Sequence, residues 1–397
     1  MIFGKRKSVA EALQETLETR GHRVDVLVEA LMRVDKAGDA SEIAAAFATI
    51  TETPSLVATL DGYCRLVYWD SARYPRVLNE AADRLKAGKA GPLTTAIASS
   101  NGDGRVRVLA VGKMLERPSP VLLPFLLQRM TDWADPVSDV ARMGVTRLLN
   151  DRPATYLQAA AEMTLHLRCR YRGGFGVKQL YAAAYDAPPQ ILAQLARSVN
   201  FAVRRFAYEV QSRRGDLKLE DLVRYTRNLD MGIRARAGDA AAREAVWTGR
   251  VDVLRKLAAG RHNEVRISAL TGLARLGQLE EIVPLLDDRS SLIRALARDA
   301  ARRTGLDAVA WYRSAVSASA PSLGAIAGLA ESGRAADAPL LHPLLGHPMA
   351  RVRAHAVGAL RILDAVPADL VRPMVEDPSR RVVRAAYKAL GLSFSSR

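Results

Sequence analysis

The sequence predicts an all-α protein, an α-solenoid of about eleven stacked helix pairs behind an N-terminal helical cap. Three observations support this fold class. An apolar residue followed four positions later by a small residue recurs about every 30 residues, alanine is abundant while aromatic residues make up only 6%, and Asp, Pro, Gly and Asn mark short turns. Alanine favours helices, whereas sheets prefer β-branched and aromatic residues. Two helices repeated at a fixed short period are typical of a solenoid.

Residues 1–60 are predicted to be a separate helical cap, because they lack the recurring pair. They contain the amphipathic stretches "SVAEALQETLETR", "RVDVLVEALMRV" and "ASEIAAAFATI". Two or three helices there would cover the end of the array, since a terminal repeat otherwise leaves its core open. We therefore expect a cap over residues 1–60 and a repeat solenoid over residues 61–397.

The recurring pair is clearest near the C-terminus, where residues 347–363 and 377–393 align without gaps. Residues i and i+4 share one face of a helix, and a small residue there lets a neighbouring helix approach closely. Nine of the eleven second members are alanine, so a second helix with one buried stripe is expected in every pair. The apolar members, which we call the apolar column, are Val77, Val106, Val140, Val177, Val203, Ile233, Val265, Ile293, Leu323, Val352 and Val382.

The position after the apolar column is basic in seven of the eleven pairs. These slot residues are Arg107, Lys178, Arg204, Arg234, Arg266, Arg294 and Arg353. The resulting D-P-x-x-x-V-R-x-x-A pattern resembles the HEAT-repeat family, in particular its short bacterial form, the phycobilisome-lyase-type HEAT-like repeats. The resemblance covers about residues 61–397. It implies that the slot arginine pairs with acids and carbonyls of the turn or the neighbouring repeat, and it leaves the function open.

The stretch "HLRCRYRGGFGVKQLY" (166–181) is an irregular copy of the repeat. Tyr181 stands where most pairs have alanine, and the spacing to the neighbouring pairs is uneven, so a bend is expected here. Its glycine-rich turn and arginines also fit an anion site, although no nucleotide-binding P-loop motif is present. Between residues 166 and 236, fourteen Lys/Arg oppose six Asp/Glu. We expect a basic, partner- or anion-binding edge formed by Arg168, Arg170, Arg172, Lys178, Arg205, Arg213 and Arg214.

Composition places limits on the environment and the partners. The formal net charge of +16 indicates an anionic partner, such as nucleic acid or an acidic protein, unless the charge serves solubility and the repeats themselves. Cys64 and Cys169 are the only cysteines, which fits a reduced cytoplasm. No apolar run reaches the roughly 18 residues of a membrane span, so no membrane partner is expected.

No motif of a known enzyme class emerges, and neither a cofactor nor a small-molecule substrate is expected. His166 and Cys169 could form half of a metal site, but no second pair follows at zinc spacing, so no metal is expected either. A HEAT-like fold also occurs in alkylpurine DNA glycosylases, which use tryptophans and a catalytic aspartate. The residue types for such a site are Trp69, Asp70, Asp132, Trp133, Asp135 and Asp139.

The favoured interpretation is a non-enzymatic scaffold that binds another macromolecule, above all a protein, through its concave groove and its basic edge. The groove is inferred from the row five residues after the apolar column, which is apolar except for Arg298. Lys and Arg would be expected there if the row cradled DNA. The alternative is a nucleic-acid-binding solenoid with glycosylase-like activity as one form of it, and steep salt dependence of binding would favour that alternative.

Overall fold

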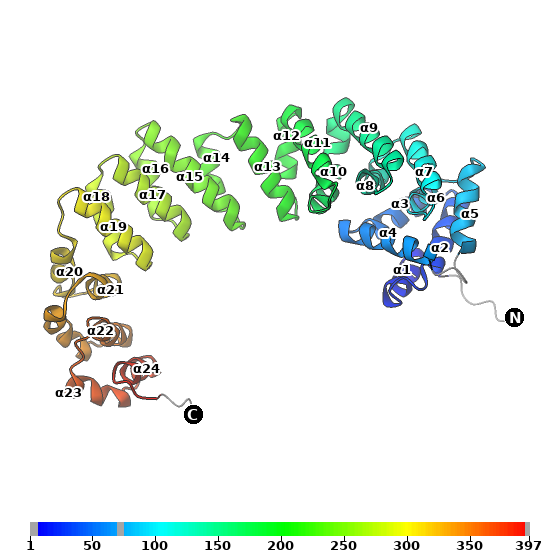
Figure 1. The fold of residues 1–397 in the computed structure, drawn as a ribbon. Helices are drawn as coiled ribbons and strands as arrows, with labels where there is room; N and C mark the ends of the chain where they lie inside the picture. Colours follow the sequence, from blue (N-terminus) through cyan, green and yellow to red (C-terminus); the bar gives the residue numbers. More distant parts are fainter. Residues whose placement is uncertain (1–6, 70–74, 394–397) are drawn as a thin grey trace. The chain divides into compact units, whose positions relative to one another are not determined.

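The computed structural model describes residues 7–69 and 75–393, and within these ranges every regular element is a helix. The chain forms two compact units, Met1–Asp216 and Leu217–Arg397. In each unit the helices follow one another as antiparallel pairs (Figure 1). The prediction of an all-α repeat architecture is therefore confirmed.

Unit 1 begins with four helices and continues with short first helices that alternate with longer second helices. The opening helices are α1 (Val9–Glu18), α2 (Val24–Ala37), α3 (Ala40–Ile50) and α4 (Pro54–Trp69). They are followed by α5 (Pro75–Lys86), α6 (Pro92–Ala98), α7 (Gly104–Glu116), η1 (Pro120–Leu122), α8 (Leu123–Met130), α9 (Asp135–Asp151), α10 (Pro153–Leu167), α11 (Gly173–Asp186), α12 (Pro189–Leu195) and α13 (Phe201–Arg214).

Unit 2 repeats the same alternation, with several first helices shortened to 3₁₀ turns. Its helices are α14 (Leu219–Tyr225), α15 (Met231–Trp247), α16 (Val251–Ala258), α17 (Asn263–Arg275), α18 (Leu279–Ile282), η2 (Val283–Asp287), α19 (Ser291–Arg303), α20 (Ala308–Val316), α21 (Leu323–Ser332), η3 (Ala335–Gly346), α22 (Ala350–Ile362), α23 (Ala368–Val371), η4 (Arg372–Glu376) and α24 (Arg380–Ala389). Proline within η2, η3 and η4 removes a backbone donor, which fits the short, tight turns seen there.

The buried stripe of the second helices follows the predicted pattern in most pairs. Seven members of the apolar column are buried, and eight of the small residues four positions later are buried as well. Val352 and Ala356 of α22 are 3% and 0% exposed, for example. Side chains at the N-caps fix where several of these helices start: Asp103 and Asn200 accept hydrogen bonds from backbone N–H groups of the first turn.

The predicted register is wrong in three second helices. In α9 the buried pair is Val137 and Ala141, three residues before the predicted one, because the helix already begins at Asp135. In α21 the buried residues are Ala325 and Leu329 instead of Leu323 and Ala327. In the irregular helix α11, Val177 and Tyr181 are only half-buried, while Leu180 and Ala184 are buried.

Six slot arginines have the same geometry, and it matches what the HEAT resemblance implies. In each, Nη1 donates to the carbonyl six residues earlier, and in five also to the carbonyl five residues earlier, at 2.6–3.1 Å. Five also pair with an acid of the following turn or repeat, as Arg353 does with Asp377 at 2.8 Å. These contacts satisfy turn carbonyls that would otherwise be left without a donor. Lys178 is the exception, since it is exposed on α11.

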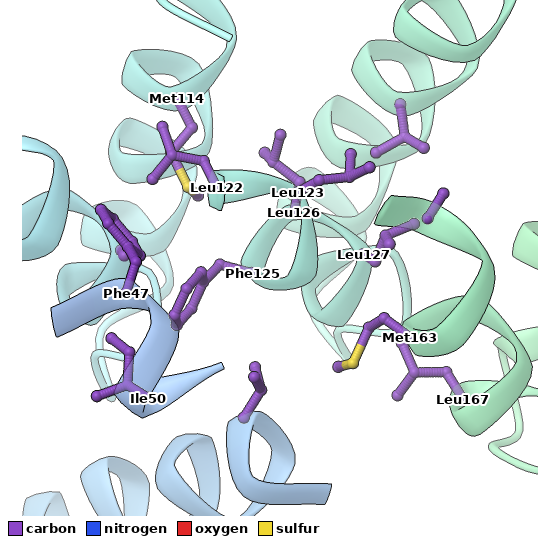
Figure 2. Packing of buried hydrophobic residues seen from close by; sticks show 14 of the residues in the cluster. Phe47, Ile50, Met114, Leu122, Leu123, Phe125, Leu126, Leu127, Met163 and Leu167 are labelled. Atoms are coloured by element: carbon purple, nitrogen blue, oxygen red, sulfur yellow. The ribbon is translucent and has the colours of Figure 1, made fainter. Parts of the chain in front are cut away.

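The N-terminal helices share a core with the first repeats. Phe47 of α3 lies edge-on to Phe125 of α8, with ring centroids 6.3 Å apart, and Met114 and Leu122 pack nearby (Figure 2). Helix α4 contacts both α8 and α10. The boundary predicted between residues 60 and 61 falls inside α4, and the boundary between the two compact units follows Asp216.

Candidate partner-binding edge

The turns that precede the second helices α9, α11 and α13 form one edge of unit 1, which we call the turn edge. Each second helix packs against the next, and the turns themselves are linked by hydrogen bonds. Arg107, which holds the turn before α7, pairs with Asp132 in the turn before α9. Arg172, in the turn before α11, donates to the Asp132 carbonyl at 2.8 Å. These contacts bring successive turns side by side.

Large apolar side chains project from the turn edge into solvent. The second residue before α9, α11 and α13 is Trp133, Tyr171 and Val199, with exposures of 71%, 101% and 92%. We call these three side chains the rungs. Phe201, the first residue of α13, is 64% exposed next to Val199. Large exposed apolar side chains at the same place in successive turns indicate an interaction surface.

Slot arginines lie against two of the exposed rings. The guanidinium of Arg107 lies 5.6 Å from the centre of the Trp133 ring, and that of Arg204 lies 5.6 Å from the Phe201 ring. Since both guanidinium groups are also held by turn carbonyls, the rings have fixed cationic neighbours. The rung Trp133 is therefore anchored although it is exposed.

Four of the predicted basic residues lie exposed in this part of unit 1. Arg168 and Arg170 precede Tyr171 in the turn before α11, Lys178 lies on α11, and Arg205 lies near the start of α13. The pKa of His166 is lowered, first by burial and then by the positive charge of Arg170. A cationic environment thus surrounds the middle rung.

The other three predicted basic residues are engaged in internal contacts. Arg172 donates to Ser138 and pairs with Asp135 at 2.8 Å. Arg214 donates to the carbonyls of Ala184 and Ala187 and pairs with Asp216 at 3.0 Å. These two arginines satisfy backbone carbonyls, so we remove them from the predicted edge.

Arg213 also has internal partners, although it is exposed. It pairs with Glu209 at 2.7 Å, and its guanidinium lies 5.8 Å from the centre of the Tyr181 ring. Tyr181, the residue that breaks the alanine pattern, donates its hydroxyl hydrogen to Glu209. The misfit tyrosine is thus accommodated by a local charged cluster at the surface.

The turn edge rests on a buried charge network that the sequence did not suggest. Asp132 accepts hydrogen bonds from Arg107 at 2.9 and 3.0 Å, and it also pairs with Arg129 and Arg65. Asp61 of α4 pairs with Arg129 across 68 residues of sequence. Burial alone would raise the pKa of Asp132, but the hydrogen bonds from Arg107 and the charge of Arg129 outweigh it, so the pKa lies below its usual value.

Asp61 shows the same balance as Asp132. Burial alone would raise the pKa of this carboxyl, but the positive charges of Arg129 and Arg65 outweigh burial and lower it. Burial also raises the pKa of the neighbouring Cys64 thiol to about 12, with the Asp61 charge adding to the effect. The network therefore keeps its carboxylates ionised while the cysteine beside it stays protonated.

The predicted apolar groove is not available as a binding surface. Eight of its eleven row residues are buried, among them Val111, Leu270 and Val357 at 0%, 2% and 0% exposure. The row faces the neighbouring second helix instead of solvent. A Cβ placed on Gly238 of α15 would lie 3.3 Å from the Cα of Val265 in α17, for example. This part of the predicted binding surface was wrong, and the exposed apolar residues lie at the turns.

The acids considered for glycosylase chemistry have structural roles or lie at the surface. Asp132 is enclosed by three arginines, Asp135 pairs with Arg172, and Asp139 is exposed on α9. Asp70 and the side chain of Trp69 lie outside the described residues. Across the described ranges, no group of three or more His, Cys, Asp or Glu side chains gathers as metal ligands would.

No single helix among the described residues has the length and apolar character needed to cross a bilayer. Only the pair Ala40–Ile50 and Pro54–Arg65, bent by 92°, meets those two criteria together.

Comparison with known proteins gives structural likeness only. No family model and no curated protein matches the chain. An engineered protein of the Northeast Structural Genomics Consortium matches with 16% identity over 97% of this chain and 98% of its own, at a TM-score of 0.24. A mutant of Kap121p matches with 10% identity over 95% of this chain and 50% of its own, at a TM-score of 0.37.

The karyopherin Kap121p bound to the extreme C-terminus of the protein phosphatase Cdc14p matches with 11% identity. That match covers 96% of this chain and 52% of the other, at a TM-score of 0.34. The chain thus spans about half the length of the two Kap121p chains. By its own helices and their recurring contacts, the chain is a helical-repeat protein.

Proposed function

We propose that this chain is a non-enzymatic HEAT-type scaffold of the cytoplasm that binds another protein through the turn edge of unit 1. The observation that carries the proposal is the set of rungs: large apolar side chains at the same position of three successive turns, with the exposed Arg168 and Arg170 beside the middle one. The repeated arginine-to-carbonyl contacts support the HEAT assignment. Both cysteines are free, as in a reducing compartment.

The chemistry of the turn edge suits a protein interface. Tryptophan, tyrosine and arginine are the residue types that most often dominate binding energy at interfaces. Trp133 has the guanidinium of Arg107 against its ring, so less side-chain entropy would be lost when a partner covers it. The exposed arginines favour a partner with acidic groups and would raise the rate of association more than the final affinity.

A second candidate, binding of single-stranded nucleic acid, is favoured by the same alternation of rings and cations. Bases stack on exposed aromatic side chains while arginines contact phosphates. The two candidates differ in salt dependence. Nucleic-acid binding should weaken steeply between about 50 and 200 mM salt, whereas a contact dominated by apolar side chains should not.

The test is an affinity pull-down from extracts of the native host with the full chain as bait. Three baits are compared: the wild type, Tyr171→Ser, and Arg168→Glu combined with Arg170→Glu. The proposal predicts a protein that the wild type retains at physiological salt and that both variants lose. The matched control is Tyr185→Ser, because Tyr185 is 54% exposed at the opposite end of the same helix α11.

The outcome separates the candidates. Loss of the same protein from the Tyr185→Ser bait, or its retention by every variant, would overturn the turn edge as the binding surface. If the retained material is nucleic acid, and purified chain binds single-stranded DNA with a steep salt dependence, the second candidate replaces the first. Circular dichroism of each variant confirms that the bait is folded.

A further inference from the structure

The positions of the rungs specify the shape of the partner segment, an inference that rests on the proposed function. We propose that the turn edge binds an extended, polyproline II-like segment that carries an apolar side chain at every third position and acidic side chains between them. Trp133, Tyr171 and Val199 would each contact one apolar side chain, and Arg168 and Arg170 would contact the acids.

The distance between rungs is set by helix packing. The rungs occupy equivalent places before α9, α11 and α13, which contact one another in series, and packed helices lie about 8–10 Å apart. A polyproline II helix has three residues per turn and rises about 3.1 Å per residue, so side chains on one side recur about every 9.3 Å. One turn of such a segment therefore matches one step along the turn edge.

The spacing of side chains along a β-strand does not match the distance between rungs. Side chains on one face of a strand recur about every 6.6–6.8 Å, which is shorter than one step of about 8–10 Å, and twice that distance falls between one step and two. Two backbone donors at these turns are also already used, since the N–H of Asp132 and that of Gly173 each bond to a carbonyl of their own turn.

The spacing of side chains along an α-helical partner matches the distance between rungs, but such a helix does not suit the surface between them. Residues seven apart on a helix lie about 10.5 Å apart, yet the residues three and four positions on share the same face and need apolar contacts too. The exposed residues near the rungs Trp133 and Tyr171 in sequence include the charged Arg168, Arg170 and Asp135. Isolated apolar contacts separated by charge suit an extended segment better than a continuous apolar stripe.

The exposed arginines determine where the partner segment needs acidic side chains. Arg168 and Arg170 precede the middle rung in its turn, while Asp135, an exposed acid at the start of α9, is already paired with Arg172 at 2.8 Å. Acidic side chains next to the middle apolar residue would therefore meet uncompensated positive charge. Prolines in the remaining positions would hold the segment in the extended form before binding, which reduces the entropy lost.

The experiment measures fluorescence anisotropy of labelled peptides with the full chain. The first probe is a peptide of about 12 residues made of Leu-Pro-Asp triplets, which places leucine at every third position. The second has the same composition, with leucines at every second position and the prolines grouped at one end. We expect the triplet peptide to bind at least about tenfold more tightly than the reordered peptide. Tyr171→Ser should weaken that binding by about fivefold or more, and Tyr185→Ser should leave it unchanged.

Each outcome decides between the two proposals. Equal binding of the two peptides, or a triplet affinity that Tyr171→Ser does not change, would overturn the extended-segment inference. If the triplet peptide fails while the partner from the pull-down still depends on Tyr171, the proposed function stands and the partner is recognised by another shape. A third peptide, in which alanine replaces proline, tests the role of the extended form, and tighter binding by that peptide would favour a helical partner instead.

Discussion

Asp132 helps to hold the turn edge in place, although its own side chain is buried. Its carboxylate accepts from Arg107 and pairs with Arg129 and Arg65, while its carbonyl accepts from Arg172. The side chain next to it in sequence, Trp133, is 71% exposed on the turn edge. The sequence offered this aspartate only as one of several residues for the glycosylase-like alternative, and it did not reveal the enclosing arginines Arg65 and Arg107, which come from other helices.

Asp132→Asn should lower the free energy of unfolding by about 3–5 kcal/mol near neutral pH, because buried arginines would lose their counter-charge. The pKa of Asp132 is lowered in the folded state. Its ion pairs therefore stabilise the wild type above the unfolded pKa of about 4, and that stabilisation is lost as the pH falls through the folded pKa. Urea unfolding of both proteins should show the difference shrinking on acidification.

The control for this substitution is Asp139→Asn on the neighbouring surface. Asp139 is exposed and lies 3.9 Å from Arg142, so its loss should change the free energy of unfolding by no more than about 0.5 kcal/mol. Equal effects of the two substitutions, or a difference that grows at low pH, would contradict the proposed role of the network.

Arg172 takes the place of a slot arginine that the preceding repeat, the one containing α9, lacks. In α9 the position after the buried Val137 is Ser138, and Arg172 reaches it from the next turn to bond the Asp132 carbonyl. Elsewhere a local slot arginine bonds the carbonyl six residues earlier, which for Ser138 is Asp132. Arg172 thus replaces a missing slot arginine from the following turn.

The role of Arg172 can be tested by moving the arginine from position 172 to position 138. Arg172→Ser should lower the free energy of unfolding by about 1–3 kcal/mol, because a buried carbonyl loses its donor. Adding Ser138→Arg should recover most of the loss, since the new side chain has the position of a slot arginine. A double-mutant cycle by urea unfolding measures the recovery. A double variant no more stable than Arg172→Ser would contradict this account.

At the scale of elements, the sequence predicted the periodic features and missed the irregular ones. A turn followed by a valine, an arginine and an alanine was enough to place most second helices. In α9 two valines stand three apart, Val137 and Val140, and only the actual helix start at Asp135 selects the first. The rungs were missed because sequence reasoning followed the buried column, whereas the rungs lie two residues before α9, α11 and α13.

Replacing two mid-helix glycines by alanine should change the free energy of unfolding in opposite directions, because only one of them lies close to a neighbouring side chain. A Cβ on Gly328 of α21 would lie 2.1 Å from the ring of Tyr312, which is fully buried, whereas a Cβ on Gly358 of α22 would meet nothing within 4 Å. Gly328→Ala should therefore lower the free energy of unfolding by about 1–3 kcal/mol through overpacking. Gly358→Ala should raise it by about 0.5–1 kcal/mol through helix propensity. Denaturant unfolding of both variants checks the sign, and a stabilising Gly328→Ala would contradict the packing of α20 on α21.

At the scale of the whole molecule, the helical repeats that the sequence predicted form two compact units. The main buried clusters are divided in the same way, one from Ala12 to Val210 and another from Leu222 to Leu363. The period of the repeat continues across Asp216 and Leu217, so periodicity could not reveal the division.

We expect fragments 1–216 and 217–397 each to fold when produced separately, because each contains its own buried core. Far-UV circular dichroism should show helix in both, and urea should unfold each in a cooperative transition. A fragment without cooperative unfolding would show that its core depends on the other unit.

The most direct test of the central claim, that the turn edge binds a protein partner, is photo-crosslinking in the native host. A photoreactive phenylalanine analogue replaces Tyr171 in one strain and Tyr185 in another, and crosslinked proteins are identified by mass spectrometry. The account predicts a protein captured from position 171 and absent from position 185, with the attachment site in an extended segment. The same proteins captured from both positions, or nucleic acid captured from position 171, would contradict it.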